Sequence, residues 1–257
     1  ADTPPWAAVT YQWQFTDSEG NTYESEWFLG DEYYDPEGDW QRYESEDIIV
    51  FVQDGLPEDT GQQTIDAMAA QRETYRQAWG HLLSNKPRAI LFNSTTTFQE
   101  WQTGTVDNRI AGLTSSEWGG TAQRLASGGV TDLTWGTVLH EVGHLYQEEF
   151  ASSFFAPGSW WTEGNASFFE LNQQYDYEQR VRRIAANGNL PVLLQGTGPN
   201  PSGTGPDGIG RYGYDVGYTF FKWLSLNYGL DAHRQLVEAY STSKSRNEIL
   251  EEVLGIP

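Results

Sequence analysis

One nine-residue segment constrains this chain more than any other. Residues 137–145 read Thr-Val-Leu-His-Glu-Val-Gly-His-Leu and contain the pattern His140-Glu141-x-x-His144. In an α-helix, residues i and i+4 lie on the same face one turn apart, so both imidazoles can reach one cation. Glu141 follows His140 by about 100° around the helix and would flank that cation. The apolar residues between them predict a buried helix, in which polar side chains need partners.

A second segment supplies a carboxylate at a matching distance. Residues 160–166 read Trp-Trp-Thr-Glu-Gly-Asn-Ala, and eighteen residues separate His144 from Glu163. A helix, a turn and a returning helix fit this interval. Two histidines and one glutamate leave a position open for water, which is typical of catalytic rather than structural zinc. The alternatives are two ordinary histidines on an amphipathic helix and, for Glu163, an exposed acid at a helix N-terminus.

Composition narrows the possible partners. The 257 residues carry a formal net charge of −21 at pH 7, and 14% of them are aromatic. This acidity disfavours nucleic acid and anionic lipid as partners. There is no cysteine, which excludes disulfides and thiolate metal ligands. No apolar run reaches the length of about 18 residues that a membrane span needs, so none is predicted.

The pattern of strands and helices favours an α+β fold. Residues 9–15 alternate between apolar and polar side chains before a turn at 17–21, which predicts a strand. Helices then dominate the second half. No linker of the kind that separates domains interrupts the sequence, so we expect a single domain over residues 1–257. Its parts are an N-terminal β extension (1–55), an α/β part (56–150) and a helical part (151–257). Further strands are predicted at 48–52, 87–92 and near 122–126, and helices at 61–80, 95–102, from Thr131 or Asp132 to 150, and at 162–174, 177–187, 214–228, 232–240 and 247–254.

These motifs together resemble the gluzincin clan of zinc metallopeptidases. His140-Glu141-x-x-His144 followed by Glu163 is similar to the ligand pattern of that clan, and Tyr214-Asp-Val-Gly-Tyr-Thr-Phe is similar to its Tyr-x-x-Gly helix. The match is strongest over residues 135–225. The order of elements from 46 to 240 resembles the short bacterial branch called peptidase MA-like. The resemblance implies a zincin-like fold, bound Zn²⁺ and a peptide or protein substrate.

The resemblance also implies a role for each site residue. It implies zinc-dependent peptide-bond hydrolysis with Glu141 as general base and Tyr214 as the hydrogen-bond donor to the oxyanion. Tyr212 and Tyr218 are rivals for the tyrosine role. Glu170, seven residues after Glu163, matches an acid of the clan that orients a histidine. The alternative interpretation of Glu170 is an exposed acid on a helix.

Some features depart from the clan or point elsewhere. There is no clear Gly-x-Met-x-Asn segment, and residues 111–114 are a poor match to it, which argues against aminopeptidase activity. The alternative function is a catalytically silent, zincin-fold binding or assembly subunit, which the aromatic content and N-terminal strands would suit. The opening Ala1-Asp2-Thr3-Pro4-Pro5 is compatible with a processed end or with an artificially shortened one, and we favour an extracytoplasmic or secreted protein.

Two loops have open interpretations. Residues 31–39 hold five carboxylates and could bind calcium, but they lack the spacing of a calcium loop, which favours a solvated acidic loop. Residues 196–210 are rich in Gly and Pro and end four residues before Tyr214. They are interpreted either as a flap over the cleft or as a plain connector.

Overall fold

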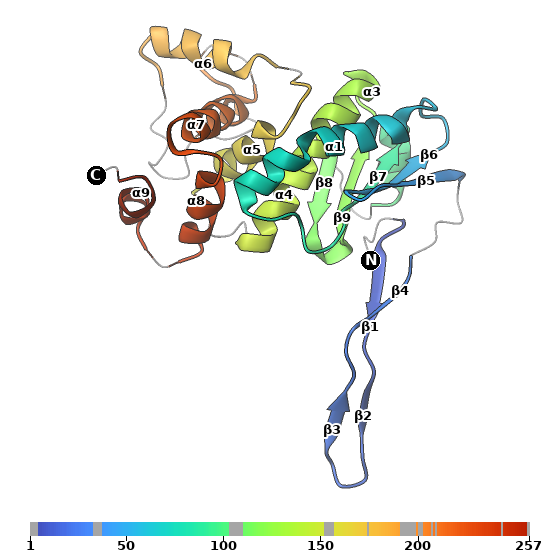
Figure 1. Ribbon diagram of the computed structural model, residues 1–257. Helices are drawn as coiled ribbons and strands as arrows, with labels where there is room; N and C mark the ends of the chain where they lie inside the picture. The colour runs from blue at the N-terminus through green and yellow to red at the C-terminus, as the bar shows by residue number, and fades with distance from the viewer. Residues whose placement is uncertain are drawn as a thin grey trace.

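The chain folds into a mixed α+β structure, as the sequence predicted. Strands dominate its first half and helices its second half, and the two parts lie side by side (Figure 1). No helix in the described part of the chain is long and apolar enough to cross a membrane. The computed structural model describes residues 5–32, 38–102, 110–151, 157–173, 175–190, 199, 203–206, 208, 210–242 and 244–255.

A five-stranded sheet forms the centre of the first half. Its strand order is β5-β6-β7-β9-β8. The three central strands run parallel, and the two edge strands, β5 and β8, run antiparallel to their neighbours. The apolar runs of β6 and β7 are buried on both faces, as expected of parallel strands in the middle of a sheet. The bounds are β5 Trp40–Glu44, β6 Ile49–Gln53, β7 Arg88–Phe92, β8 Gly112–Ser115 and β9 Gly120–Arg124.

Helices cover one face of this sheet and aromatic side chains cover the other. Helix α1 (Thr60–Trp79) buries Tyr75 and Trp79 against α4, and it ends at Gly80 with φ 83°. On the opposite face, Trp6 stacks on Phe51 with ring centroids 4.9 Å apart. The short helix α2 (Thr95–Glu100) covers the same face. The sheet is therefore a rigid layer between two apolar clusters, and only its edges remain to form a site.

The second half is helical, and its helices α5 and α7 pack in close contact. At Gly164 of α5, an added Cβ would fall 2.3 Å from the Cα of Gly217 in α7, so the two backbones touch where only glycine fits. Residues 129–150 form one continuous helical segment that includes a π-helical turn, a feature that often occurs at functional sites. The bounds are α3 Gly129–Asp132, the π turn Leu133–Thr137, α4 Val138–Phe150, α5 Ser159–Phe168, α6 Tyr177–Ala186, α7 Tyr212–Tyr228, α8 Ala232–Tyr240 and α9 Arg246–Leu254.

The strand-rich N-terminal part divides in two. Strands β5 and β6 join the five-stranded sheet, whereas residues 8–32 form a narrow ribbon of two antiparallel strand pairs that projects from the body (Figure 1). We call residues 8–32 the arm. Its strands are β1 Ala8–Tyr11, β2 Gln14–Thr16, β3 Thr22–Glu24 and β4 Phe28–Glu32.

Two predicted helix boundaries were wrong. The helix expected to be capped by Thr131 or Asp132 begins at Gly129, and the Asp132 carboxylate instead accepts a hydrogen bond from Asn172. The helix predicted at 162–174 spans Ser159–Phe168. It stops there because the N–H groups of residues 171 and 172 both donate to the Trp135 carbonyl in the π turn. Most of the acidic segment 31–39 and of the loop 196–210 lies outside the described residues.

Candidate metal centre

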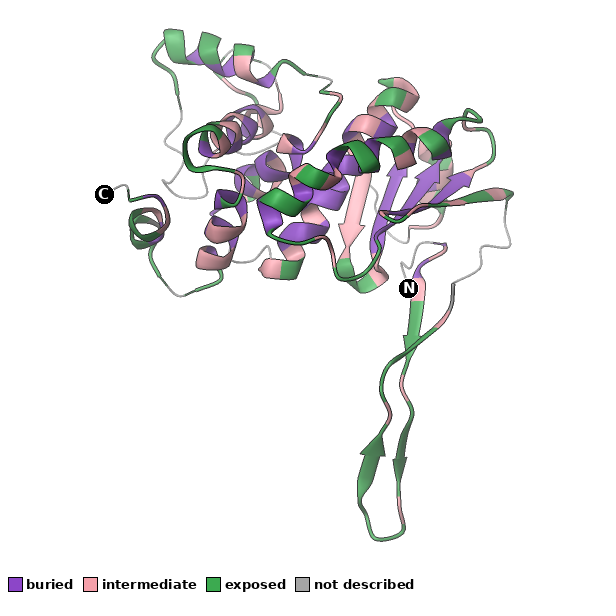
Figure 2. Ribbon diagram, in the orientation of Figure 1, coloured by how far each residue is buried: buried purple, intermediate pink, exposed green. Residues whose placement is uncertain are grey.

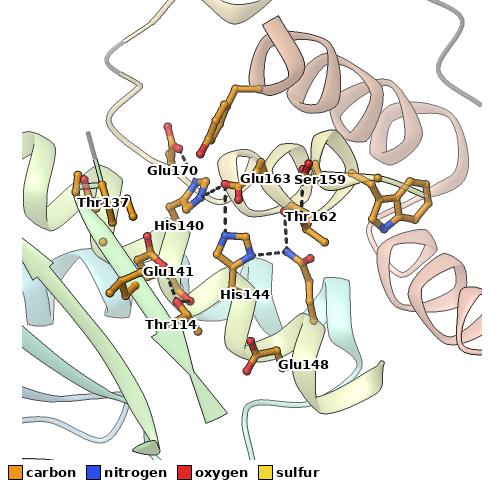
Figure 3. Close-up of a pocket in the computed structure, with 18 of the residues that line it drawn as sticks. Thr114, Thr137, His140, Glu141, His144, Glu148, Ser159, Thr162, Glu163 and Glu170 are labelled. Carbon is orange, nitrogen blue, oxygen red and sulfur yellow. Dashed lines mark hydrogen bonds and ion pairs between the residues drawn. The ribbon is translucent and has the colours of Figure 1, made fainter. Parts of the chain in front are cut away.

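Three side chains converge between α4 and α5. Nε2 of His140 lies 3.1 Å from Oε2 of Glu163, and Nε2 of His144 lies 3.6 Å from the same oxygen (Figure 3). One ligand atom from each residue falls within 4.8 Å of the other two, and they form the one such group found among the described residues. Two imidazoles and a carboxylate aimed at one point suit a divalent transition metal.

The two helices that carry these ligands are joined by Gln147. This side chain is buried on α4 one turn after His144, and its Nε2 donates to the Thr162 carbonyl at 3.0 Å. The same amide nitrogen lies 3.4 Å from Nδ1 of His144. Because Thr162 immediately precedes Glu163, this contact fixes the Glu163 carboxylate opposite the two histidines.

A second carboxylate holds His140 from behind. Oε1 of Glu170 lies 2.9 Å from Nδ1 of His140, and the hydroxyl of Tyr177 donates to Oε2 of Glu170 at 2.9 Å. Ser167 Oγ is a further neighbour, 3.3 Å from the same imidazole nitrogen. A carboxylate on the far ring nitrogen fixes the tautomer in which Nε2 is free for a metal. Glu170 lies after the end of α5, and its side chain is largely buried, so the alternative of an exposed helix acid was wrong.

The cluster is strongly charged in the absence of a metal. Burial by itself lowers the pKa of His140, but its hydrogen bonds to Glu163 and Glu170 outweigh burial and raise the pKa to about 10. Burial likewise opposes ionisation of Glu163, yet His144 and His140 hold its pKa well below the usual range. A metal ion that binds here must therefore displace a proton from His140, which couples metal affinity to pH.

Glu141 lines the same cleft as the ligands and contacts the edge strand β8. The Thr114 hydroxyl lies 2.6 Å from Oε2 of Glu141 and 2.9 Å from its backbone carbonyl, so it can donate to either (Figure 3). At Gly112 of the same strand, an added Cβ would fall 2.3 Å from Oε1 of Glu141. A side chain at residue 112 would displace the Glu141 carboxylate, so glycine leaves room for it here.

Tyr214 lies against the ligand cluster, whereas its two rivals do not. The ring centroids of Tyr214 and His140 are 6.0 Å apart. Burial, the charge of Glu163 and a hydrogen bond to it hold the pKa of Tyr214 well above its usual range, so the phenol stays protonated. Tyr212 donates to the Asn189 carbonyl, and the ring of Tyr218 lies against that of Tyr177, so neither lines the cleft.

Arg211 fixes the position of Tyr214 from the other side. Its guanidinium lies 4.2 Å from the ring centroids of both Tyr175 and Tyr214, and it donates to the Tyr177 hydroxyl at 3.4 Å. The backbone of Arg211 is in the left-handed region, with φ 67°, at the N-terminus of α7. A cation is unfavourable at that end of a helix, so the aromatic and hydroxyl contacts are what hold Arg211 there.

These groups line one open cleft. It has a volume of about 720 Å³ and is bounded by β8 on one side and by α5 and the start of α7 on the other. His140, Glu141, His144, Glu163, Glu170 and Tyr214 all contribute to its wall. The structure thus brings together every site residue that the sequence singled out.

Sequence reasoning missed the residues that support this cluster. Thr114, Gln147, Tyr177 and Arg211 each contact a predicted site residue, but only Thr114 does so from a distant part of the chain, because the other three lie within seven residues of their partners. Two signals were available: Arg211 directly precedes the Tyr212-Gly-Tyr214 sequence, and Thr114 belongs to the segment 111–114 that was compared with the exopeptidase motif. The others belong to no motif.

Comparison with known proteins gives no information on function, so any functional proposal depends on the site itself. No family model matches the chain, and no curated protein matches it.

Proposed function

We propose that this protein is a zinc-dependent peptidase with a zincin-like fold. The observation that carries the proposal is the convergence of His140, His144 and Glu163 in an open cleft, with Glu141 beside them on the same helix. A structural zinc site would be closed by a fourth protein ligand, whereas three ligands facing a cleft leave a position for water and substrate. The uninterrupted packing of sheet, α4 and α5 supports a rigid site of this kind.

The donor set fits zinc better than a hard cation. Imidazole nitrogen is a good ligand for zinc, whereas calcium and magnesium prefer oxygen ligands throughout. Glu170 behind His140 completes the carboxylate–histidine arrangement common around zinc. When bound, zinc would lower the pKa of a water molecule and polarise a carbonyl group.

Glu141 and Tyr214 would perform the remaining chemistry. Glu141 accepts the proton of the attacking water and passes it to the leaving amine, and Thr114 holds the carboxylate in place for both steps. Tyr214 stays protonated and donates a hydrogen bond to the oxygen that gains negative charge. Arg211 keeps the phenol ring directed at the cleft through its contact with the ring face.

A peptide is the substrate that the shape of the cleft favours. β8 is an edge strand of the sheet and borders the cleft along its length. An extended peptide can pair with a free strand edge through its backbone, and this mode of recognition places little demand on side chains. A bound peptide would lie between β8 and the three ligands, with its backbone next to Glu141.

Turnover by metal-loaded protein tests the proposal. Protein stripped with a chelator and reloaded with one equivalent of zinc should cleave members of a mixed peptide library, detected by mass spectrometry. Glu141→Gln should retain zinc and lose turnover by about 10²–10⁴-fold, because glutamine keeps the shape but cannot accept the proton. Glu149→Gln is the matched control: this exposed residue lies on the same helix and outside the cleft.

Two results would contradict the proposal. Zinc-loaded protein that cleaves no peptide would favour a binding or assembly subunit that keeps the fold without turnover. Turnover at the parent rate in Glu141→Gln would remove Glu141 as the base.

A further inference from the structure

The arm carries a row of exposed aromatic side chains along one face. Phe15 pairs with Tyr23 across β2 and β3, with ring centroids 5.0 Å apart, and Tyr11 pairs with Phe28 across β1 and β4, with centroids 5.4 Å apart. Side chains alternate between the two faces of a strand, so Tyr11, Trp13 and Phe15 share one face. The Tyr11 and Trp13 rings are indeed in contact, 6.0 Å apart.

Polar pairs occupy the other face near the tip. Gln14 donates to Glu24 at 2.7 Å, and the hydroxyls of Thr16 and Thr22 lie 3.2 Å apart. These two pairs flank the Phe15–Tyr23 pair along the ribbon and must point the opposite way. We call the side that carries Tyr11, Trp13, Phe15, Tyr23 and Phe28 the aromatic face.

The aromatic face is not covered by the rest of the molecule. No residue from 8 to 30 is buried, and most of the ribbon is exposed in Figure 2. Trp13 is 68% exposed and Phe15 is 62% exposed. A lone two-stranded ribbon is marginally stable in water, and an antiparallel sheet normally covers one face. A contiguous exposed patch of aromatic side chains marks an interaction site.

The charges of the arm limit what can cover it. Its charged side chains between residues 8 and 30 are Asp17, Glu19, Glu24 and Glu26, and the first Lys or Arg of the chain is Arg42. The chain as a whole carries −21. A second copy would bring the same acids against them, and an anionic membrane would also be repelled. Complementarity instead requires cationic groups around an apolar centre.

We propose that the arm binds a partner protein that presents an apolar strip flanked by lysine or arginine side chains. The aromatic face would pack on the strip, as tyrosine and tryptophan commonly do at the centre of interfaces, and the acids would pair with the cationic rim. This function is independent of the metal centre, because the arm projects away from the body and none of its residues lines the cleft (Figure 1). It applies equally to a peptidase and to an assembly subunit.

A synthetic strand peptide tests the recognition chemistry. The probe alternates lysine and valine, and its matched control alternates glutamate and valine. Binding of each labelled peptide to the full chain is measured by fluorescence anisotropy at low and high salt. We expect the lysine peptide to bind at least about tenfold more tightly than the glutamate peptide, and salt to weaken it.

Variants distinguish the aromatic face from general acidity. Trp13→Ser with Phe15→Ser should weaken binding of the lysine peptide by about tenfold or more, because large aromatic side chains carry most interface energy. Gln12→Ser with Gln14→Ser changes the same strand segment on the polar face and should stay within about twofold. Circular dichroism of both variants checks that the body remains folded.

Three outcomes would overturn the proposal. Equal loss in both double variants, or none in the aromatic one, would show that only net charge attracts the peptide. A dimer in sedimentation equilibrium that Trp13→Ser with Phe15→Ser dissociates would make a second copy the occupant. Tight binding to neutral phosphatidylcholine vesicles that depends on the same two residues would make a lipid surface the occupant.

Discussion

On the sheet side of the cleft, Glu141 meets one side-chain hydroxyl, that of Thr114 in β8. On the helical side, Glu163 and Glu170 belong to a network of imidazole, hydroxyl and guanidinium groups that continues through Tyr177 to Arg211. We call the side with Glu141 and Thr114 the sheet wall. We call the side with Glu163, Glu170, Tyr177 and Arg211 the helical wall. In the helical wall each carboxylate has several hydrogen-bond partners, which suits a proposed metal site. In the sheet wall the Glu141 carboxylate has one side-chain partner, which suits a group proposed to transfer protons.

This division has a consequence for mutagenesis. Substitutions in the helical wall should first change metal binding, and those in the sheet wall should change turnover without changing metal content. Metal binding and turnover are measured by different methods, so the role predicted for each wall can be contradicted separately.

The largest effect is expected from the third ligand of the helical wall. Glu163→Ala should abolish stoichiometric zinc binding, because two imidazoles alone do not make a three-ligand site. Metal content after gel filtration measures this, and Glu149→Ala serves as the control on α4. Undiminished zinc in Glu163→Ala would remove this residue from the ligand set.

Tyr214 lies on the helical wall but is expected to affect turnover alone. Tyr214→Phe removes one hydroxyl and should lower kcat by about 10²–10³-fold while zinc content stays the same. Tyr212→Phe and Tyr218→Phe are matched controls, since neither residue lines the cleft. A loss confined to KM would indicate binding of the ground state, and a loss in either control would transfer the role to that tyrosine.

A pair of milder variants tests the division directly. Glu170→Gln weakens the partner of His140 and should lower zinc affinity by about 10–100-fold. Thr114→Val removes the hydroxyl partner of Glu141 and should lower kcat by about tenfold with unchanged zinc affinity. Competition with a chromogenic chelator measures affinity, and peptide cleavage at saturating zinc measures kcat. If both variants change the same quantity, the two walls do not have separate roles.

A change in the free energy of unfolding, rather than in metal binding or turnover, is expected from a histidine that is buried behind the end of α5. His233 of α8 is fully buried against Phe168, Phe169 and Trp79, and burial lowers its pKa from 6.5 to about 3. The unfolded chain therefore binds this proton at higher pH than the folded one. The contribution of neutral His233 to the free energy of unfolding is complete above pH 6.5. This contribution is lost as the pH falls toward 3, by up to about 1.4 kcal/mol per pH unit.

Urea unfolding between pH 7 and pH 4 measures this loss. Acidic residues also titrate in this range, so the test is the difference between the parent and His233→Gln. The variant should show a shallower decline of the unfolding free energy on acidification. Equal slopes would mean that His233 does not titrate on unfolding.

The sequence by itself determined the local chemistry of this protein. The spacing of His140 and His144 fixed them on one face of a helix, because the period of the helix depends only on the backbone. The alternation from Val9 to Phe15 likewise predicted a strand, because side chains alternate between the two faces of a strand. Most predicted helices occur within a few residues of the expected bounds, because each carries its own apolar periodicity.

Tertiary structure alone decided which groups complete the site. Thr114 meets Glu141 across 27 residues, and Arg211 meets Tyr177 across 34. No periodicity carries that information, because the contacts depend on how β8, α5 and α7 pack on α4. The choice of Tyr214 over Tyr212 and Tyr218 as the cleft residue has the same origin. All three lie within two turns of α7, and only the close contact of Gly217 with Gly164 settles which part of the helix faces the ligands.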